Sequence, residues 1–190
     1  MKHLYLAGGP FYGLQEVFSH MRGVEEVVAG YANSKIADPT KEQVASGDTG
    51  AVECVKVTYN PKKIDIADLL SLFFKVVDPY TDGEQGEAKG PQYRSGVYYT
   101  SGEDLPQIEY YACYVQSRGG EPIAALGNLI VNDSVSRGKE RRPILTEYKR
   151  LENFYPAPES EQFYLRSHPE AYTPINIEAL ARDGLISLWE

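Results

Sequence analysis

The chain has 190 residues, a formal net charge of −8, 42% apolar residues and 24% charged residues, a composition typical of soluble globular proteins. This length fits one domain with its own core, since domains commonly have about 100–200 residues. The negative charge argues against a nucleic-acid-binding face, and no apolar run approaches the roughly 20 residues that span a bilayer. The apolar N-terminal stretch is too short for a signal peptide, so we expect a cytoplasmic protein that binds neither nucleic acid nor membrane.

Cysteine and histidine usage excludes two further classes of site. The two cysteines, Cys54 and Cys113, form no Cys-x-x-Cys pair and are too few for a disulfide framework. The three histidines, His3, His20 and His168, lack the spacing of metal ligands. We therefore expect no metal site and no cofactor.

The N-terminal segment predicts a strand, a tight turn and a helix. Leu4 to Ala7 is short and apolar and stops at two glycines, which is typical of a buried strand that ends in a turn. Apolar residues then recur at helical spacing from Phe11 to Met21. Pro10 is expected at the first helical position, where the missing N–H of proline is no loss.

The next strand carries the most informative acidic residue. It is expected over 51–59, after a strand over 24–31 and a polar, turn-rich stretch over 33–50. Successive strand residues point to opposite faces, so Glu53 shares a face with Val55 and Val57, while Cys54 lies on the other. Glu53 is therefore expected on an apolar face.

The rest of the chain predicts further helices and strands. The predicted elements are a helix capped by Asp65 that ends before Pro79, a long loop over 78–91, a strand over 96–100, a helix over 103–116, an exposed loop with a basic cluster over 133–142, a strand over 144–151, a short helix over 158–167 and a closing helix over 175–190 that carries Trp189. This order lacks the regular βα rhythm of a doubly wound sheet, so an α+β class fits better.

Several collinear segments resemble the type A peptide methionine sulfoxide reductase (MsrA) family. They are Gly9-Pro10-Phe11-Tyr12, Gly30-Tyr31-Ala32, Ser46-Gly47-Asp48-Thr49-Gly50-Ala51-Val52-Glu53, Asp78-Pro79, Gln85-Gly86, Gln92-Tyr93-Arg94-Ser95, Thr146-Glu147 and Phe154-Tyr155-Pro156-Ala157. Each is weak alone, but their order and spacing make the set specific. The resemblance implies a two-layer α/β sandwich with a ferredoxin-like core over residues 1–172, followed by a helical extension over 173–190 packed on the domain.

The resemblance also implies a set of site residues. Members of the family attack the sulfoxide sulfur with a cysteine thiolate at a helix N-terminus, and that position is Pro10 here. Glu53 matches the acid that protonates the sulfoxide oxygen, and Tyr93 matches a tyrosine that hydrogen-bonds the same oxygen. Phe11 and Tyr12 match the Phe-Trp pair that seats the methyl group.

Other family positions are changed. Lys41 stands at a family tyrosine, Ala88 at an aspartate and Glu161 at a histidine, and residues 172–190 contain no resolving cysteine. Lys41 is predicted to bind ligand with Phe11 and Tyr12, or to pair with Glu53 and hold it ionised. The missing cysteines argue against coupling to thioredoxin.

Two functional hypotheses follow from this pattern. The main expectation is a non-catalytic or repurposed homologue that binds methionine sulfoxide or another small ligand with a methyl-bearing or apolar group. The alternative is an active methionine (S)-sulfoxide reductase that uses Cys54, Cys113 or an external thiol. Cys54 is expected to face away from the site because it adjoins Glu53, and Cys113 is expected to be a small core residue of a helix.

Overall fold

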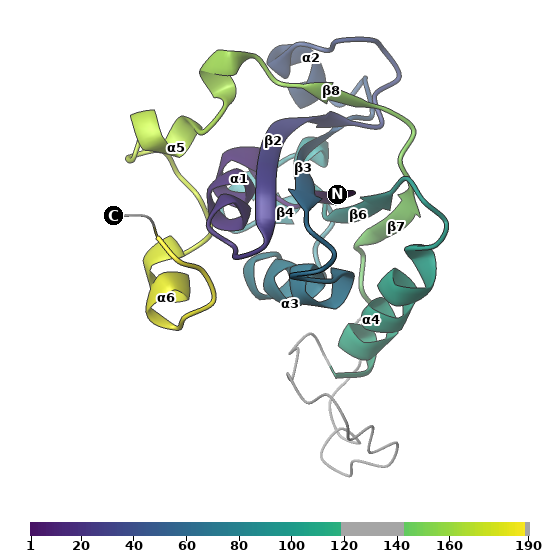
Figure 1. The fold of residues 1–190 in the computed structure, drawn as a ribbon. Coiled ribbons are helices and arrows are strands. Elements are labelled where there is room, and N and C mark those ends of the chain that lie inside the picture. The colour runs from purple at the N-terminus through teal and green to yellow at the C-terminus, as the bar shows by residue number, and fades with distance from the viewer. Residues whose placement is uncertain (119–142, 189–190) are drawn as a thin grey trace.

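The computed structural model describes residues 1–118 and 143–188 (Figure 1). In chain order its helices and strands are β1 (Lys2–Ala7), α1 (Phe11–Ser19), β2 (Val24–Ala32), α2 (Lys41–Ala45), β3 (Val52–Tyr59), α3 (Ile66–Val76), β4 (Glu84–Gln85), β5 (Ala88–Lys89), β6 (Gly96–Tyr99), α4 (Leu105–Arg118), β7 (Glu147–Arg150), β8 (Phe154–Pro156), α5 (Tyr164–Ser167) and α6 (Ile177–Arg182). Short 3-10 turns lie at Pro91–Tyr93 and Glu159–Glu161. The basic cluster predicted at 133–142 and Trp189 lie outside the described residues.

Six strands form one curled, mixed sheet in the order β7-β6-β1-β3-β2-β8 (Figure 1). The β6–β7 pair is parallel, and the other pairs in the sheet are antiparallel. Strand β3 lies between β1 and β2, where Cys54 is opposite Ala7 and Glu53 is opposite Tyr31. The α+β class expected from the sequence is confirmed.

The two faces of the sheet bury different sets of side chains. On one face Val55 and Val57 join the main core with residues of α1 and α3. On the other face Cys54 packs in a smaller cluster with Tyr5 and Tyr98. The alternation predicted for β3 is therefore confirmed, and it separates Glu53 from Cys54.

The starts of α1 and α3 were both predicted from the sequence. Pro10 has φ −57° and ψ 126° and occupies the N-cap position of α1, with Phe11 as the first helical residue. Pro10 thus lies one position earlier than predicted, because its extended ψ precludes a helical turn at that residue. The predicted cap of α3 is confirmed, since the Asp65 side chain accepts a hydrogen bond from the backbone N–H of Asp68.

Two short elements were not predicted. Helix α2 lies within the turn-rich stretch and buries only Val44, so it shows no apolar stripe. Strands β4 and β5 form a small hairpin inside the predicted loop over 78–91. The Gln85 side chain holds this hairpin to Asp78, and a Cβ on Gly9 would meet Gln85 at 3.0 Å. The hairpin therefore packs on the turn that precedes α1.

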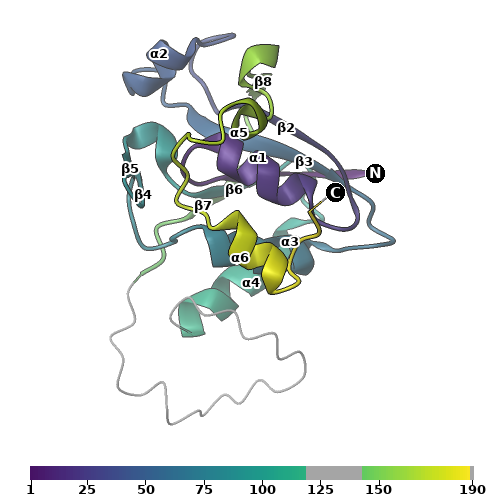
Figure 2. The ribbon, with the colours of Figure 1, turned by 90° about the vertical axis from the view of Figure 1, so that its left-hand side faces the viewer.

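The C-terminal predictions need correction in detail. The helix predicted over 158–167 is split into a 3-10 turn and α5, because the Gln162 side chain donates hydrogen bonds to the carbonyls of Ala29 and Ala157 and Phe163 has φ +49°. The closing helix is limited to α6, which ends before Gly184 at φ +73°. Helices α5 and α6 lie on either side of α1 (Figure 2). The domain division at residue 172 stays a prediction.

Within residues 1–118 and 143–188, no helix is both long enough and apolar enough to cross a membrane. The cytoplasmic location stays a prediction.

Candidate functional site

The carboxyl group of Glu53 lies at the N-terminal end of α1. The backbone N–H of Phe11 donates a hydrogen bond to its Oε2 atom at 3.0 Å. The residue is only 3% exposed. Burial raises the pKa of Glu53 to about 7, although the Phe11 hydrogen bond and the charge of Lys41 lower it. The protonated form of this carboxyl group is therefore available at a higher pH than for an ordinary glutamate.

Tyrosine hydroxyls surround this acid. Tyr31 lies opposite Glu53 in the β2–β3 register. Tyr93 is the last residue of the 3-10 turn at Pro91–Tyr93, and its backbone carbonyl accepts a hydrogen bond from the N–H of Gly9. Burial raises the pKa of Tyr12, Tyr31 and Tyr93, and the charge of Glu53 raises each further. These hydroxyls therefore stay protonated and can donate hydrogen bonds.

Phe11 and Tyr12 form an aromatic group beside Glu53. The Phe11 ring is fully buried and lies 5.6 Å from the ring of Tyr31, while Tyr12 is partly exposed and lies 5.5 Å from Tyr164. The Tyr12 hydroxyl donates to the carbonyl of Tyr172 at 3.0 Å. The Phe11 ring is therefore part of the core beside Glu53, and of these two rings only that of Tyr12 reaches the surface.

Lys41 does not pair with Glu53 as hypothesised. Its Nζ atom lies 3.0 Å from Oε2 of Glu161. Partial burial lowers the pKa of Lys41, but the hydrogen bond and charge of Glu161 outweigh this and raise it. The ion pair forms because α2 and the 159–161 turn meet beside Tyr164, whose ring centroid is 5.8 Å from the ammonium. Glu53 is therefore not held ionised by a direct lysine partner.

Neither cysteine is placed to attack a substrate at Glu53. Cys54 is fully buried on the opposite face of β3, as predicted, and burial raises its pKa above the ordinary range. Cys113 is exposed on α4, so the prediction of a core residue is wrong. Ile108 and Val115 make the buried stripe of α4, and Cys113 lies off that stripe.

Sequence reasoning missed two residues of the site. Tyr31 was seen only as part of a motif, yet its buried hydroxyl has no hydrogen-bond partner among residues 1–118 and 143–188. Tyr164 contacts both Tyr12 and Lys41 but belongs to no quoted motif. For α2 a signal was present, since Thr40 and Gln43 form a capping box that fixes the start of the helix at Lys41.

Glu53→Gln is expected to change how stability depends on pH. A carboxyl group with a raised pKa binds its proton in the folded state but loses it in the unfolded state at about pH 4.3, so its burial destabilises the fold progressively as pH rises toward about 7. Urea unfolding should show the variant gaining up to about 3 kcal/mol over the wild type between about pH 5 and about pH 8. A stability difference that does not change with pH would contradict the assignment.

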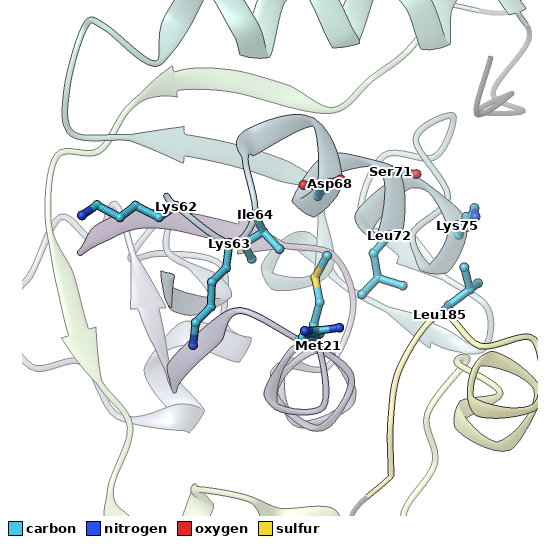
Figure 3. A pocket seen from close by; sticks show the side chains of 10 residues that line it. Met21, Lys62, Lys63, Ile64, Asp68, Ser71, Leu72, Lys75 and Leu185 are labelled. Atoms are coloured by element: carbon cyan, nitrogen blue, oxygen red, sulfur yellow. The ribbon is translucent and has the colours of Figure 1, made fainter. Parts of the chain in front are cut away.

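A separate surface hollow of about 700 Å³ lies at the other end of α1. Figure 3 shows Met21 after α1, Leu72 of α3 and Leu185 after α6 pointing toward one another. Lysine side chains line its edge. The hollow contains none of the predicted site residues.

Comparisons with known proteins agree with this geometry. A family model described as peptide methionine sulfoxide reductase matches residues 2–187. The peptide methionine sulfoxide reductase MsrA of Mycoplasma genitalium is 36% identical over 180 residues, which cover 94% of this chain and 100% of the relative. The reduced form of Mxr1 from Saccharomyces cerevisiae has a TM-score of 0.73 and 31% identity, over 90% of this chain and 88% of that one. Mxr1 in complex with Trx2 has a TM-score of 0.52 and 25% identity, over 86% of this chain and 84% of that one.

These matches contradict the main functional expectation, that of a non-catalytic or repurposed homologue. The family model runs almost from end to end, and the Mycoplasma relative that bears the name of the reductase is matched over its whole length. The similarity therefore extends through the whole scaffold of the site. The chain belongs to the peptide methionine sulfoxide reductase family.

Proposed function

We propose that the protein reduces methionine (S)-sulfoxide to methionine at the Glu53 site, with an external thiol as the reductant. The observation that carries the proposal is the Glu53 carboxyl group, buried at the start of α1, where burial raises its pKa to about 7. Sulfoxide reduction needs such an acid, because the oxygen must be protonated before it can leave the sulfur.

Each side chain of the site receives a role in this proposal. Glu53 donates a proton to the sulfoxide oxygen, and Tyr93 and Tyr31 donate hydrogen bonds to it. The unpartnered, buried hydroxyl of Tyr31 supports its inclusion. The Tyr12 ring borders the methyl group of the substrate and the buried Phe11 ring packs behind it, at the aromatic pair that the family resemblance implies.

The reaction balances with two thiols. A thiolate bonds to the substrate sulfur, and the S–O bond breaks as the oxygen takes one proton from Glu53 and a second from the thiol pool to leave as water. A second thiolate then attacks the sulfur of the first thiol, releasing methionine and a disulfide. Glu53 regains its proton from solvent.

The thiol is proposed to come from outside the chain. Pro10, which we place at the nucleophile position of the family, carries no thiol. Cys54 is fully buried on the face of the sheet opposite Glu53. Cys113 lies near Tyr148 of β7, and β7 is separated from β3 by β6 and β1, three strand spacings of about 4.8 Å each.

A thioredoxin-type dithiol is one such reductant, because it supplies both thiols itself and the missing resolving cysteines, which argued against coupling to thioredoxin, are then not required. The structurally similar Mxr1 is known in complex with Trx2, and this supports a redox protein as partner. Two molecules of a small thiol would supply the same two thiol groups. We therefore propose that reduction depends on the concentration of added thiol.

We infer that this chemistry rests on a two-layer sandwich with a ferredoxin-like core. Helices α1 and α3 contribute to the main core on one face of the sheet, while the cluster on the other face draws its residues from strands. Residues 1–172 form the proposed domain. Ile175 and Ile186 join the main core, which supports a packed extension over 173–190.

A turnover assay tests the proposal. The protein is incubated with methionine (S)-sulfoxide and dithiothreitol, and methionine is quantified by chromatography. We expect turnover above the thiol-only background, undiminished in the Cys54→Ser/Cys113→Ser variant. Loss of turnover in that variant would show that the attacking thiol is Cys54 or Cys113 and not an external thiol. Turnover no higher than background would sink the proposal.

A further inference from the structure

The Lys41–Glu161 ion pair stands beside the acid of the site and takes no part in the proposed chemistry. Its side chains come from segments 120 residues apart, and the ammonium and carboxylate are 3.0 Å from each other. The Lys41 side chain is 44% exposed and that of Glu161 is 22% exposed, so both charged groups remain accessible from solvent.

Ring contacts connect this pair to Glu53. The Lys41 ammonium lies over the Tyr164 ring, which lies 5.5 Å from Tyr12, the neighbour of Phe11. The backbone of Phe11 in turn holds the carboxyl group of Glu53. The charges of Lys41 and Glu161 also act on the pKa of Glu53, so both groups lie within electrostatic reach of its carboxyl group. A ligand whose sulfoxide reaches Glu53 across Tyr12 can therefore extend its other end toward one positive and one negative charge.

We propose that the Lys41–Glu161 pair recognises the α-carboxylate and α-ammonium groups of free methionine (S)-sulfoxide, so that the protein prefers the free amino acid to a methionine sulfoxide residue within a peptide. This rests on the proposed function, because it names the substrate class of the same site. A residue inside a peptide has neither charge and gains nothing from the pair.

Both charged groups have capacity left for a ligand. A lysine ammonium has three donors, and one is used by Oε2 of Glu161. A carboxylate has two acceptor oxygens, and no bond to Oε1 of Glu161 is formed within the described part of the chain. The ligand carboxylate can bind Lys41 and the ligand ammonium can bind Glu161 without separation of the pair, giving four alternating charges.

Binding measurements test the inference separately from turnover. Dissociation constants are measured by calorimetry for free L-methionine (S)-sulfoxide and for its N-acetyl, N-methylamide derivative, which mimics a peptide residue. Because partly exposed charge pairs contribute little each, the free amino acid is expected to bind about three- to tenfold more tightly. Derivatives blocked at only one end should lie between.

Three variants complete the design. Lys41→Gln/Glu161→Gln is expected to bind both ligands equally, and the charge-swapped Lys41→Glu/Glu161→Lys, which keeps an ion pair, is expected to lose the preference as well. Lys63→Gln/Glu25→Gln, which removes a similar pair at 3.2 Å elsewhere, should keep it. Equal affinities in the wild type, binding of neither ligand, or a preference unchanged in the first variant would each overturn the inference. A preference without turnover would overturn only the proposed function.

Discussion

Glu53→Gln is expected to lower the kcat for methionine sulfoxide reduction by at least about 100-fold, in line with the usual effect of removing a general acid. The glutamine keeps the size of the side chain and an oxygen that can accept from the N–H of Phe11, so the start of α1 should be preserved. What it removes is the proton that the leaving oxygen needs. Steady-state assays at fixed thiol concentration provide the measurement.

The pH profile distinguishes loss of the acid from a general structural defect. The wild-type rate per thiolate should fall as pH rises through about 7, where Glu53 ionises. The same rate in the variant should be low and flat. Glu16→Gln is the matched control, because Glu16 is a largely buried glutamate of α1 that binds His20 and Arg166 instead of facing the site. Activity of Glu53→Gln equal to that of Glu16→Gln would remove Glu53 from the mechanism.

The parts of the site that were predictable from sequence follow from local rules. Strand alternation is enough to put Glu53 and Cys54 on opposite faces of β3, because each residue reverses the direction of the side chain. The turn at Gly9 and the helix after Pro10 follow from backbone chemistry. These rules place Glu53, Phe11 and Tyr12 in the correct elements without any knowledge of distant contacts.

The remaining parts depend on contacts between distant segments. Tyr31 lies opposite Glu53 only because β2 and β3 pair in one particular register. Lys41 pairs with Glu161, which lies 120 residues further along the chain. Sequence spacing alone could not show whether Lys41 pairs with Glu161 or with Glu53. Helix α2, which presents Lys41, is stabilised by its Thr40 cap and one buried valine, and such short elements leave little periodic signal.

Pro10→Cys is expected to raise the rate of sulfoxide reduction by at least about 100-fold at low external thiol, because a tethered nucleophile replaces a bimolecular attack. The fold should accept the change, since the backbone at position 10 is in an extended conformation open to any L-residue and proline donates no hydrogen bond there. The new thiol would lie at the N-terminus of α1, where the helix dipole lowers a thiol pKa.

A single-turnover experiment shows whether the restored thiol works with the existing acid. Without added thiol, Pro10→Cys should convert about one equivalent of sulfoxide per protein and become a sulfenic acid, which dimedone traps for detection by mass spectrometry. Pro10→Ser is the control of similar size, because its hydroxyl is a poor nucleophile at neutral pH. Combining Pro10→Cys with Glu53→Gln should abolish the burst, since attack on sulfur and protonation of oxygen belong to one step. A folded Pro10→Cys variant that gives no burst would mean that Glu53 does not face the sulfoxide oxygen when the sulfur lies beside position 10, and the proposed placement of the substrate would be wrong.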